Sequence, residues 1–218
     1  MNDLSLTQKY LLCTLGRSGR FSTYDSTKVA CFAAAGVVEL LLDGVVLLDG
    51  EKLSVRTALP ASMEYLRPVY GVIEAKQPVK FEKVLESFTL TLTDRLFYEL
   101  LDGVGRSLEA AGCVKADTGR RGLFGRGAVY VPQRAAVDSV VQNIRAELLE
   151  DGELSEDIVA LTALLSKSGG LARFFSAYEK QDLNRRLREI SRDPRAAVVR
   201  NAVDYIDTLL VAVIVAST

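Results

Sequence analysis

The sequence predicts a mainly α-helical protein, a single globular multi-helix domain over residues 1–218 with a short winged-type hairpin and a protruding β-hairpin at about 113–131. Three observations support this prediction. Apolar residues recur at helical spacing along most of the chain. Two short β-prone stretches flank glycine-containing turns. No linker-like composition separates two halves, and 218 residues are enough for one sizeable core.

The helical pattern is interrupted at residues that commonly begin or end helices. Ser26 is expected to cap the second helix and Gly44 to end it, while Pro68 and Pro78 interrupt the third and fourth helices. The expected helices cover about 5–15, 26–43, 61–75, 79–88, 93–111, 133–150, 154–167, 179–191 and 194–216.

Two hairpins are expected between the helices. In the first, over 45–55, Asp49-Gly50 is the sequence typical of a type I′ turn. The second has its arms at Cys113–Lys115 and Ala128–Val131. A helix followed by a hairpin thus appears twice, an order that is typical of winged-helix modules.

The composition excludes several functions. The net charge of −1 argues against a dedicated nucleic-acid binder, which usually has a basic domain. The chain has no histidine, so Ser-His-Asp or Cys-His catalysis and histidine-ligated zinc are excluded. Its cysteines, Cys13, Cys31 and Cys113, are far apart and are expected to be reduced core thiols. We expect no enzyme activity, no cofactor and no metal site.

No segment predicts export or membrane insertion. The first residues alternate apolar and polar side chains, unlike a signal peptide. The apolar run at 209–216 has eight residues, fewer than the roughly 18 that a spanning helix needs. We therefore expect a cytoplasmic protein whose last helix is buried.

The stretch "TGRRGLFGRG" at the turn of the second hairpin combines opposite properties. Arg120, Arg121 and Arg126 surround the apolar pair Leu123 and Phe124. Arginines near an anionic membrane contribute about 1 kcal/mol each, and burying a large apolar side chain contributes roughly 1.5–3 kcal/mol. The tip is therefore expected to contact a membrane, a neighbouring subunit or its own domain, and the residues alone leave these three alternatives open.

The segments "LSLTQKYLLCTL", "GVVELLLDGVVLLDG", "LEAAGCV", "GLFGRGAVYVP" and "DTLLVAVIVAST", taken in order, resemble the Golgi phosphoprotein 3 family. These Golgi effectors bind phosphatidylinositol 4-phosphate and have bacterial relatives, which this chain resembles because it starts at the domain itself. The resemblance implies a mainly helical domain attached peripherally to membranes through a basic headgroup pocket. In eukaryotic members the hairpin is linked to oligomer and membrane contacts, and the proteins bind cytoplasmic tails of glycosyltransferases and the coatomer coat.

The family's headgroup pocket uses one tryptophan and three arginines. By offset from "VEL", the tryptophan falls at Tyr24 and the first arginine near Ala33, while the other two fall near Tyr98 and Leu101. The arginines are thus missing from these positions. The headgroup candidates that remain in this sequence are Tyr24, Lys28, Arg95 and Arg106.

The leading hypothesis is a peripheral protein on the cytoplasmic membrane face that binds anionic lipid headgroups. It would bind through a basic surface and an apolar hairpin tip, with phosphatidylinositol 4-phosphate as the headgroup that the resemblance implies. The expected partners are an anionic lipid, a second copy of the chain through the hairpin, and cytoplasmic tails of membrane proteins. Two alternatives stay open: a winged-helix-like nucleic-acid-binding module, and an oligomeric scaffold that binds no lipid.

Overall fold

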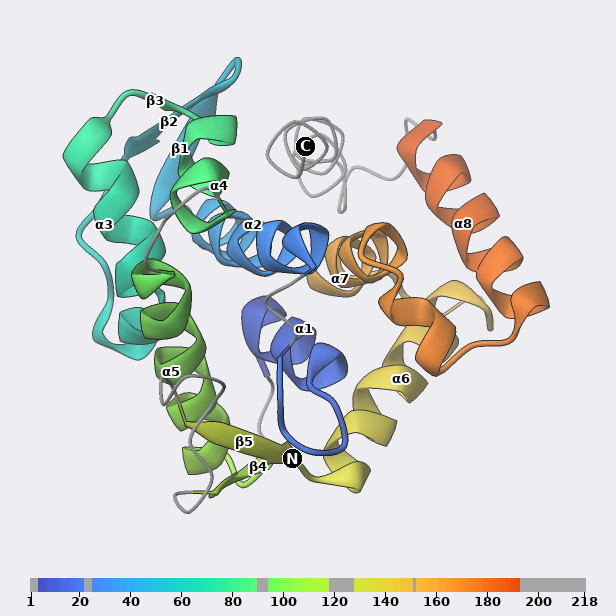
Figure 1. The fold of residues 1–218 in the computed structure, drawn as a ribbon. Helices are drawn as coiled ribbons and strands as arrows, with labels where there is room; N and C mark the ends of the chain where they lie inside the picture. Colours follow the sequence, from blue (N-terminus) through green and yellow to red (C-terminus); the bar gives the residue numbers. More distant parts are fainter. Residues whose placement is uncertain (1–3, 22–24, 90–93, 118–127, 151, 193–218) are drawn as a thin grey trace.

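The computed structural model describes residues 4–21, 25–89, 94–117, 128–150 and 152–192 (Figure 1). Three predicted features lie outside these residues: Tyr24, the hairpin tip with Arg120, Arg121, Leu123, Phe124 and Arg126, and the helix at 194–216. The described helices are α1 (Leu6–Thr14), α2 (Ser26–Leu42), 3-10 helix η1 (Ala61–Leu66), α3 (Arg67–Lys76), α4 (Phe81–Thr89), α5 (Arg95–Ala110), α6 (Arg134–Leu148), α7 (Glu156–Lys167), 3-10 helix η3 (Gly170–Arg173) and α8 (Ala177–Arg192). The mainly helical fold is as predicted.

Helices α1, α2 and α7 form the centre of the molecule, with α3, α4 and α5 on one side and α6 and α8 on the other (Figure 1). Helix α2 is buried at every position from Val29 to Leu41. A helix that is apolar all round is typical of a core position. Over residues 29–41, α2 therefore presents no exposed side chain that could contact nucleic-acid bases.

Polar contacts fix α1 within this core. The carboxylate of buried Glu39 on α2 accepts hydrogen bonds from the backbone N–H of Thr7, at 2.8 Å, and from the hydroxyl of Tyr65, at 2.5 Å. Burial and then the charge of Glu39 raise the pKa of Tyr65. Lys9 forms an ion pair with Asp157 on α7. These long-range contacts join α1 to α2, η1 and α7.

The first hairpin is part of a three-stranded antiparallel sheet in the order β1 (Val46–Asp49), β2 (Lys52–Val55) and β3 (Val79–Lys80). Asp49 pairs with Lys52, so the turn is centred on Gly50 and Glu51 and not on Asp49-Gly50 as predicted. Gly50 has a φ of 57°, and among the described residues Asp94 is the only non-glycine residue with positive φ. The predicted type I′ turn is therefore wrong, because it requires two positive φ values.

Two helix starts also differ from the predictions. Asp25, not Ser26, caps α2, with its side chain accepting a hydrogen bond from the backbone N–H of Lys28 at 3.1 Å. The predicted helix at 61–75 begins as the 3-10 helix η1 and continues as α3, with Pro68 in the first turn of α3. Proline is tolerated there because the first-turn N–H groups have no partner within the helix.

Candidate functional site

The second hairpin is fixed to α5 by one tyrosine. Strands β4 (Val114–Asp117) and β5 (Val129–Pro132) pair antiparallel. The ring of Tyr130 lies so close to α5 that a Cβ added at Gly105 would be 2.3 Å from its Cε2 atom. Its hydroxyl lies 3.3 Å from both the carbonyl and the carboxylate oxygen of Asp102, which also accepts the Ala128 N–H at 3.3 Å. Burial and then the Asp102 carboxylate raise the pKa of Tyr130 to about 12.

The same tyrosine also contacts the loop after α1. This loop is a tight turn, because the Gly16 N–H donates to the Arg20 carbonyl at 3.0 Å and the Gly19 N–H to the Gly16 carbonyl at 2.8 Å. The Gly19 carbonyl accepts a hydrogen bond from the Tyr130 N–H at 3.3 Å. Gly19 has a φ of 75°, and a Cβ there would lie 2.7 Å from the Tyr130 backbone, so both its conformation and its contact favour glycine. Tyr130 thus holds together the loop, the hairpin and α5.

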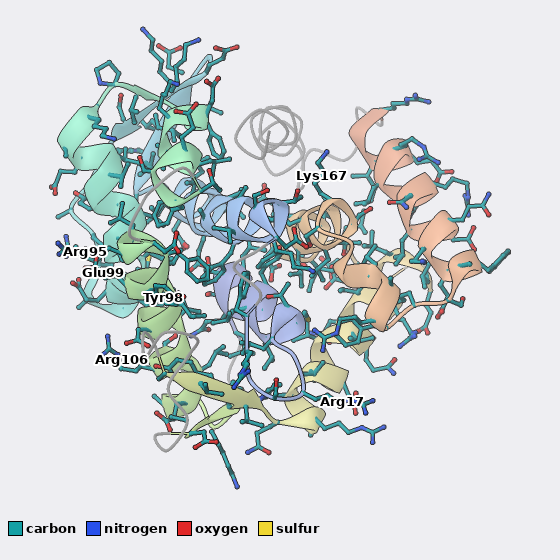
Figure 2. The ribbon with its side chains drawn as sticks, in the orientation of Figure 1. Arg17, Arg95, Tyr98, Glu99, Arg106 and Lys167 are labelled. Atoms are coloured by element: carbon teal, nitrogen blue, oxygen red, sulfur yellow. The ribbon has the colours of Figure 1, made fainter. Side chains whose placement is uncertain are left out.

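Four exposed basic residues lie on the elements that meet at this junction, here called the hairpin-base cations: Arg17 and Arg20 in the loop, Arg106 on α5 and Lys115 on β4. Figure 2 shows Arg17 and Arg106 on opposite sides of the hairpin. Within the described parts of the chain, none of the four forms an ion pair. Their charge is therefore available to an external anion.

Of the sequence-predicted headgroup candidates, the structure describes Lys28, Arg95 and Arg106. Arg106 is one of the hairpin-base cations. Arg95 lies on the same helix, but its Nε forms an ion pair with Glu99 at 2.7 Å. Lys28, on α2, forms an ion pair with Asp25 at 2.8 Å. Although burial alone would raise the pKa of Asp25, the hydrogen bonds and charge of Lys28 hold it below its usual value.

The family's headgroup positions carry apolar packing in this chain. Ala33 is fully buried and Leu101 is 6% exposed. Tyr98 packs edge-on against Phe97 with ring centroids 5.3 Å apart, and Phe97 in turn contacts Phe21 at 5.2 Å. Aliphatic or aromatic side chains therefore occupy all three positions near which the resemblance implied arginines.

A groove of about 790 Å³ runs between α5 and the segment formed by η1 and α3. Its floor is mainly apolar, with Pro68 and Val72 on one side and Leu96 and Gly103 on the other. Volumes of roughly 300–1,000 Å³ are typical of ligand-binding pockets. Arg106 contributes to this groove as well as to the hairpin-base cations.

Sequence reasoning missed three of the hairpin-base cations: Lys115, and the loop residues Arg17 and Arg20. The signal that could have found the two arginines is the string "GRSGR", which combines glycine and arginine as the hairpin tip does. What the string does not show is its contact with Tyr130, more than one hundred residues away.

Comparison with protein-family models matches residues 6–206 to the family described as Golgi phosphoprotein 3 (GPP34). A search of curated proteins gave no match. Over the residues that the structure describes, no helix has the length and apolar character needed to cross a membrane. The same residues include no cluster of acidic and cysteine side chains that could hold a metal ion.

Proposed function

The chain belongs to the Golgi phosphoprotein 3 family, and from this premise we propose that it is a peripheral membrane protein that binds anionic lipid headgroups. The contact surface consists of the hairpin-base cations together with the hairpin tip. The proposal places the protein on the cytoplasmic membrane face and assigns it no catalytic role. The absence of histidine from all 218 residues is consistent with a binding function.

The observation that carries the proposal is the arrangement of cations around Tyr130. Arg17 and Arg20 come from a loop near the start of the chain, and Arg106 and Lys115 from α5 and β4. Contacts with one buried tyrosine join all three elements. Because these cations have no carboxylate partners among the described residues, binding an anionic surface breaks no ion pair.

The expected energy is modest. Four basic residues near an anionic membrane contribute about 1 kcal/mol each, and association costs consume part of this sum. Insertion of Leu123 and Phe124 from the tip would add apolar burial. Binding should therefore be reversible and should weaken with salt, since exposed charges are screened within about 8 Å at physiological ionic strength.

The lipid specificity is expected to be broad. The family's headgroup arginines correspond to buried Ala33 and Leu101 and to the aromatic Tyr98. Cations spread over a surface respond to charge density more than to the shape of one headgroup. We therefore propose binding to acidic lipids in general, with phosphatidylinositol 4-phosphate as one ligand among them.

Vesicle flotation tests the proposal. The protein is mixed with vesicles of neutral phosphatidylcholine alone, or with added phosphatidylserine or phosphatidylinositol 4-phosphate. Flotation is expected with both acidic lipids at low salt and not with the neutral vesicles. The double variant Arg17→Glu, Arg106→Glu should bind at least about 30-fold more weakly, since two lost contacts amount to about 2 kcal/mol.

A control variant carries the same change in charge elsewhere. Lys83 on α4 and Arg185 on α8 are exposed and lie away from the hairpin (Figure 1). Lys83→Glu, Arg185→Glu should float as the wild-type protein does. If both double variants lose flotation equally, the effect depends only on net charge and not on the hairpin-base cations. If the folded wild-type protein does not float with acidic vesicles, the proposal is refuted. Light scattering on the same samples tests self-association through the hairpin.

A further inference from the structure

The groove between α3 and α5 has its free positive charges at its two ends. Lys76 lies at the end of α3, and its Nζ donates to the Ser87 hydroxyl at 3.2 Å. Arg106 lies near the other end, beyond Gly103 on α5. Within the described part of the chain, neither cation has a carboxylate partner.

The other charged residues of the groove are each held in an ion pair, one within the groove and one with a neighbouring residue of α5. Arg67 donates two hydrogen bonds to the Glu64 carboxylate, at 3.0 and 2.7 Å. Glu99 is paired with Arg95 at 2.7 Å. The groove is therefore an apolar channel with an uncompensated cation at each end.

Small residues shape the floor of the channel. A Cβ added at Gly71 on α3 would meet no atom within 4 Å, so this position opens into free space. On the opposite wall, a Cβ at Gly103 would lie 3.1 Å from the Tyr65 carbonyl oxygen, so α5 and η1 approach closely there. The floor is thus shallow and open along α3, and it is bounded below by the contact of α5 with η1.

We propose that this groove binds an acidic segment of a partner protein, in which two carboxylates flank a few small apolar side chains. Leu96 and Arg106 both line the groove and are ten residues apart on α5, or about 15 Å along the helix axis. An extended segment of five residues spans about 13 Å. Its terminal carboxylates would reach Lys76 and Arg106 while its central side chains cover Pro68 and Val72.

The charge distribution favours a peptide over a lipid. A headgroup concentrates its negative charge at one place, whereas Lys76 and Arg106 are separated by the apolar floor. Carboxylates spaced along an extended chain match that separation. This inference does not depend on membrane binding, and only Arg106 is common to both surfaces.

The test uses the full chain labelled with ¹⁵N and three blocked pentapeptides. Glu-Ala-Leu-Ala-Glu should shift the amide signals of Gly71 and Gly103 in a saturable way. Glu-Glu-Ala-Leu-Ala has the same composition and charge without the spacing, and should bind more weakly. The variant Lys76→Glu, Arg106→Glu should lose about tenfold in affinity for the first peptide and should gain affinity for Lys-Ala-Leu-Ala-Lys.

A second variant separates the groove from the membrane surface. Gly71→Leu fills open space and favours the helix, so the protein should remain folded while the groove is blocked. It should abolish the peptide-induced shifts and leave vesicle flotation unchanged. The inference is overturned if no peptide shifts these amides at millimolar concentration, if both acidic peptides bind equally, or if dihexanoyl phosphatidic acid shifts the amides where the peptides do not.

Discussion

Two helical glycines are expected to respond in opposite ways to substitution by alanine. Gly105 on α5 faces the ring of Tyr130, whose Cε2, Cδ2 and Cζ atoms would lie 2.3–2.5 Å from an added Cβ. Gly71 on α3 faces free space. The variants Gly105→Ala and Gly71→Ala introduce the same methyl group and restrict the unfolded chain in the same way. They differ only in what surrounds the new methyl group in the folded protein.

The expected magnitudes follow from these surroundings. Replacing a helical glycine by alanine stabilises by about 0.8–1 kcal/mol where nothing obstructs the new methyl group. Gly71→Ala should show this gain. At Gly105 the ring cannot move freely, because Tyr130 is 2% exposed and its hydroxyl is bonded to Asp102. Overpacking of this kind costs about 1–3 kcal/mol, so Gly105→Ala should be less stable than Gly71→Ala by that amount.

Urea denaturation followed by circular dichroism measures both free energies of unfolding. A third variant, Gly105→Ala combined with Tyr130→Leu, removes the obstructing ring. In a double-mutant cycle the two substitutions should then be coupled by at least about 1 kcal/mol. The reasoning is refuted if Gly105→Ala stabilises as much as Gly71→Ala, because Tyr130 would then not be held against α5.

Two further variants test the contacts around this junction and the end of α1. Tyr130→Phe should cost about 1 kcal/mol at neutral pH through the lost hydroxyl contacts. Because folding raises the pKa of Tyr130 from 10.0 to about 12, the wild type, unlike the variant, should lose stability as pH rises from 10 towards 12. The advantage of the wild type in urea titrations should therefore be smaller at pH 11.5 than at pH 9, and a constant difference would contradict this. Arg173 donates hydrogen bonds to the carbonyls of Cys13 and Leu15 at 2.7 and 2.9 Å. Arg173→Met should therefore lower the free energy of unfolding by about 2 kcal/mol. An unchanged urea midpoint would show that water satisfies these carbonyls as well as the guanidinium does.

The helices were predictable because their signals are local. The helix end at Gly44 and the apolar periodicity placed α1, α2 and α5 within one or two residues of their observed bounds. Strand β3 was missed because it has two residues and is defined by pairing with β2. No periodicity is detectable in so short a segment.

The candidate site was less predictable because it depends on tertiary contacts. The sequence predicts Arg106 as a headgroup candidate, and the structure shows it exposed on α5, but the loop that carries Arg17 is joined to the hairpin only through the contact between Gly19 and Tyr130. The groove likewise depends on how closely Gly103 approaches Tyr65. Contacts between residues so far apart in the sequence leave no local pattern.

The central claim is that the hairpin-base cations face an anionic bilayer, and paramagnetic relaxation tests it most directly. Amide relaxation in the ¹⁵N-labelled protein is compared on acidic vesicles with and without a spin-labelled headgroup. Enhanced relaxation is expected at Arg17, Gly19 and Lys115, and none along α8. Enhancement at α8 with none at the hairpin base, or no enhancement anywhere while the protein is bound, would contradict the account.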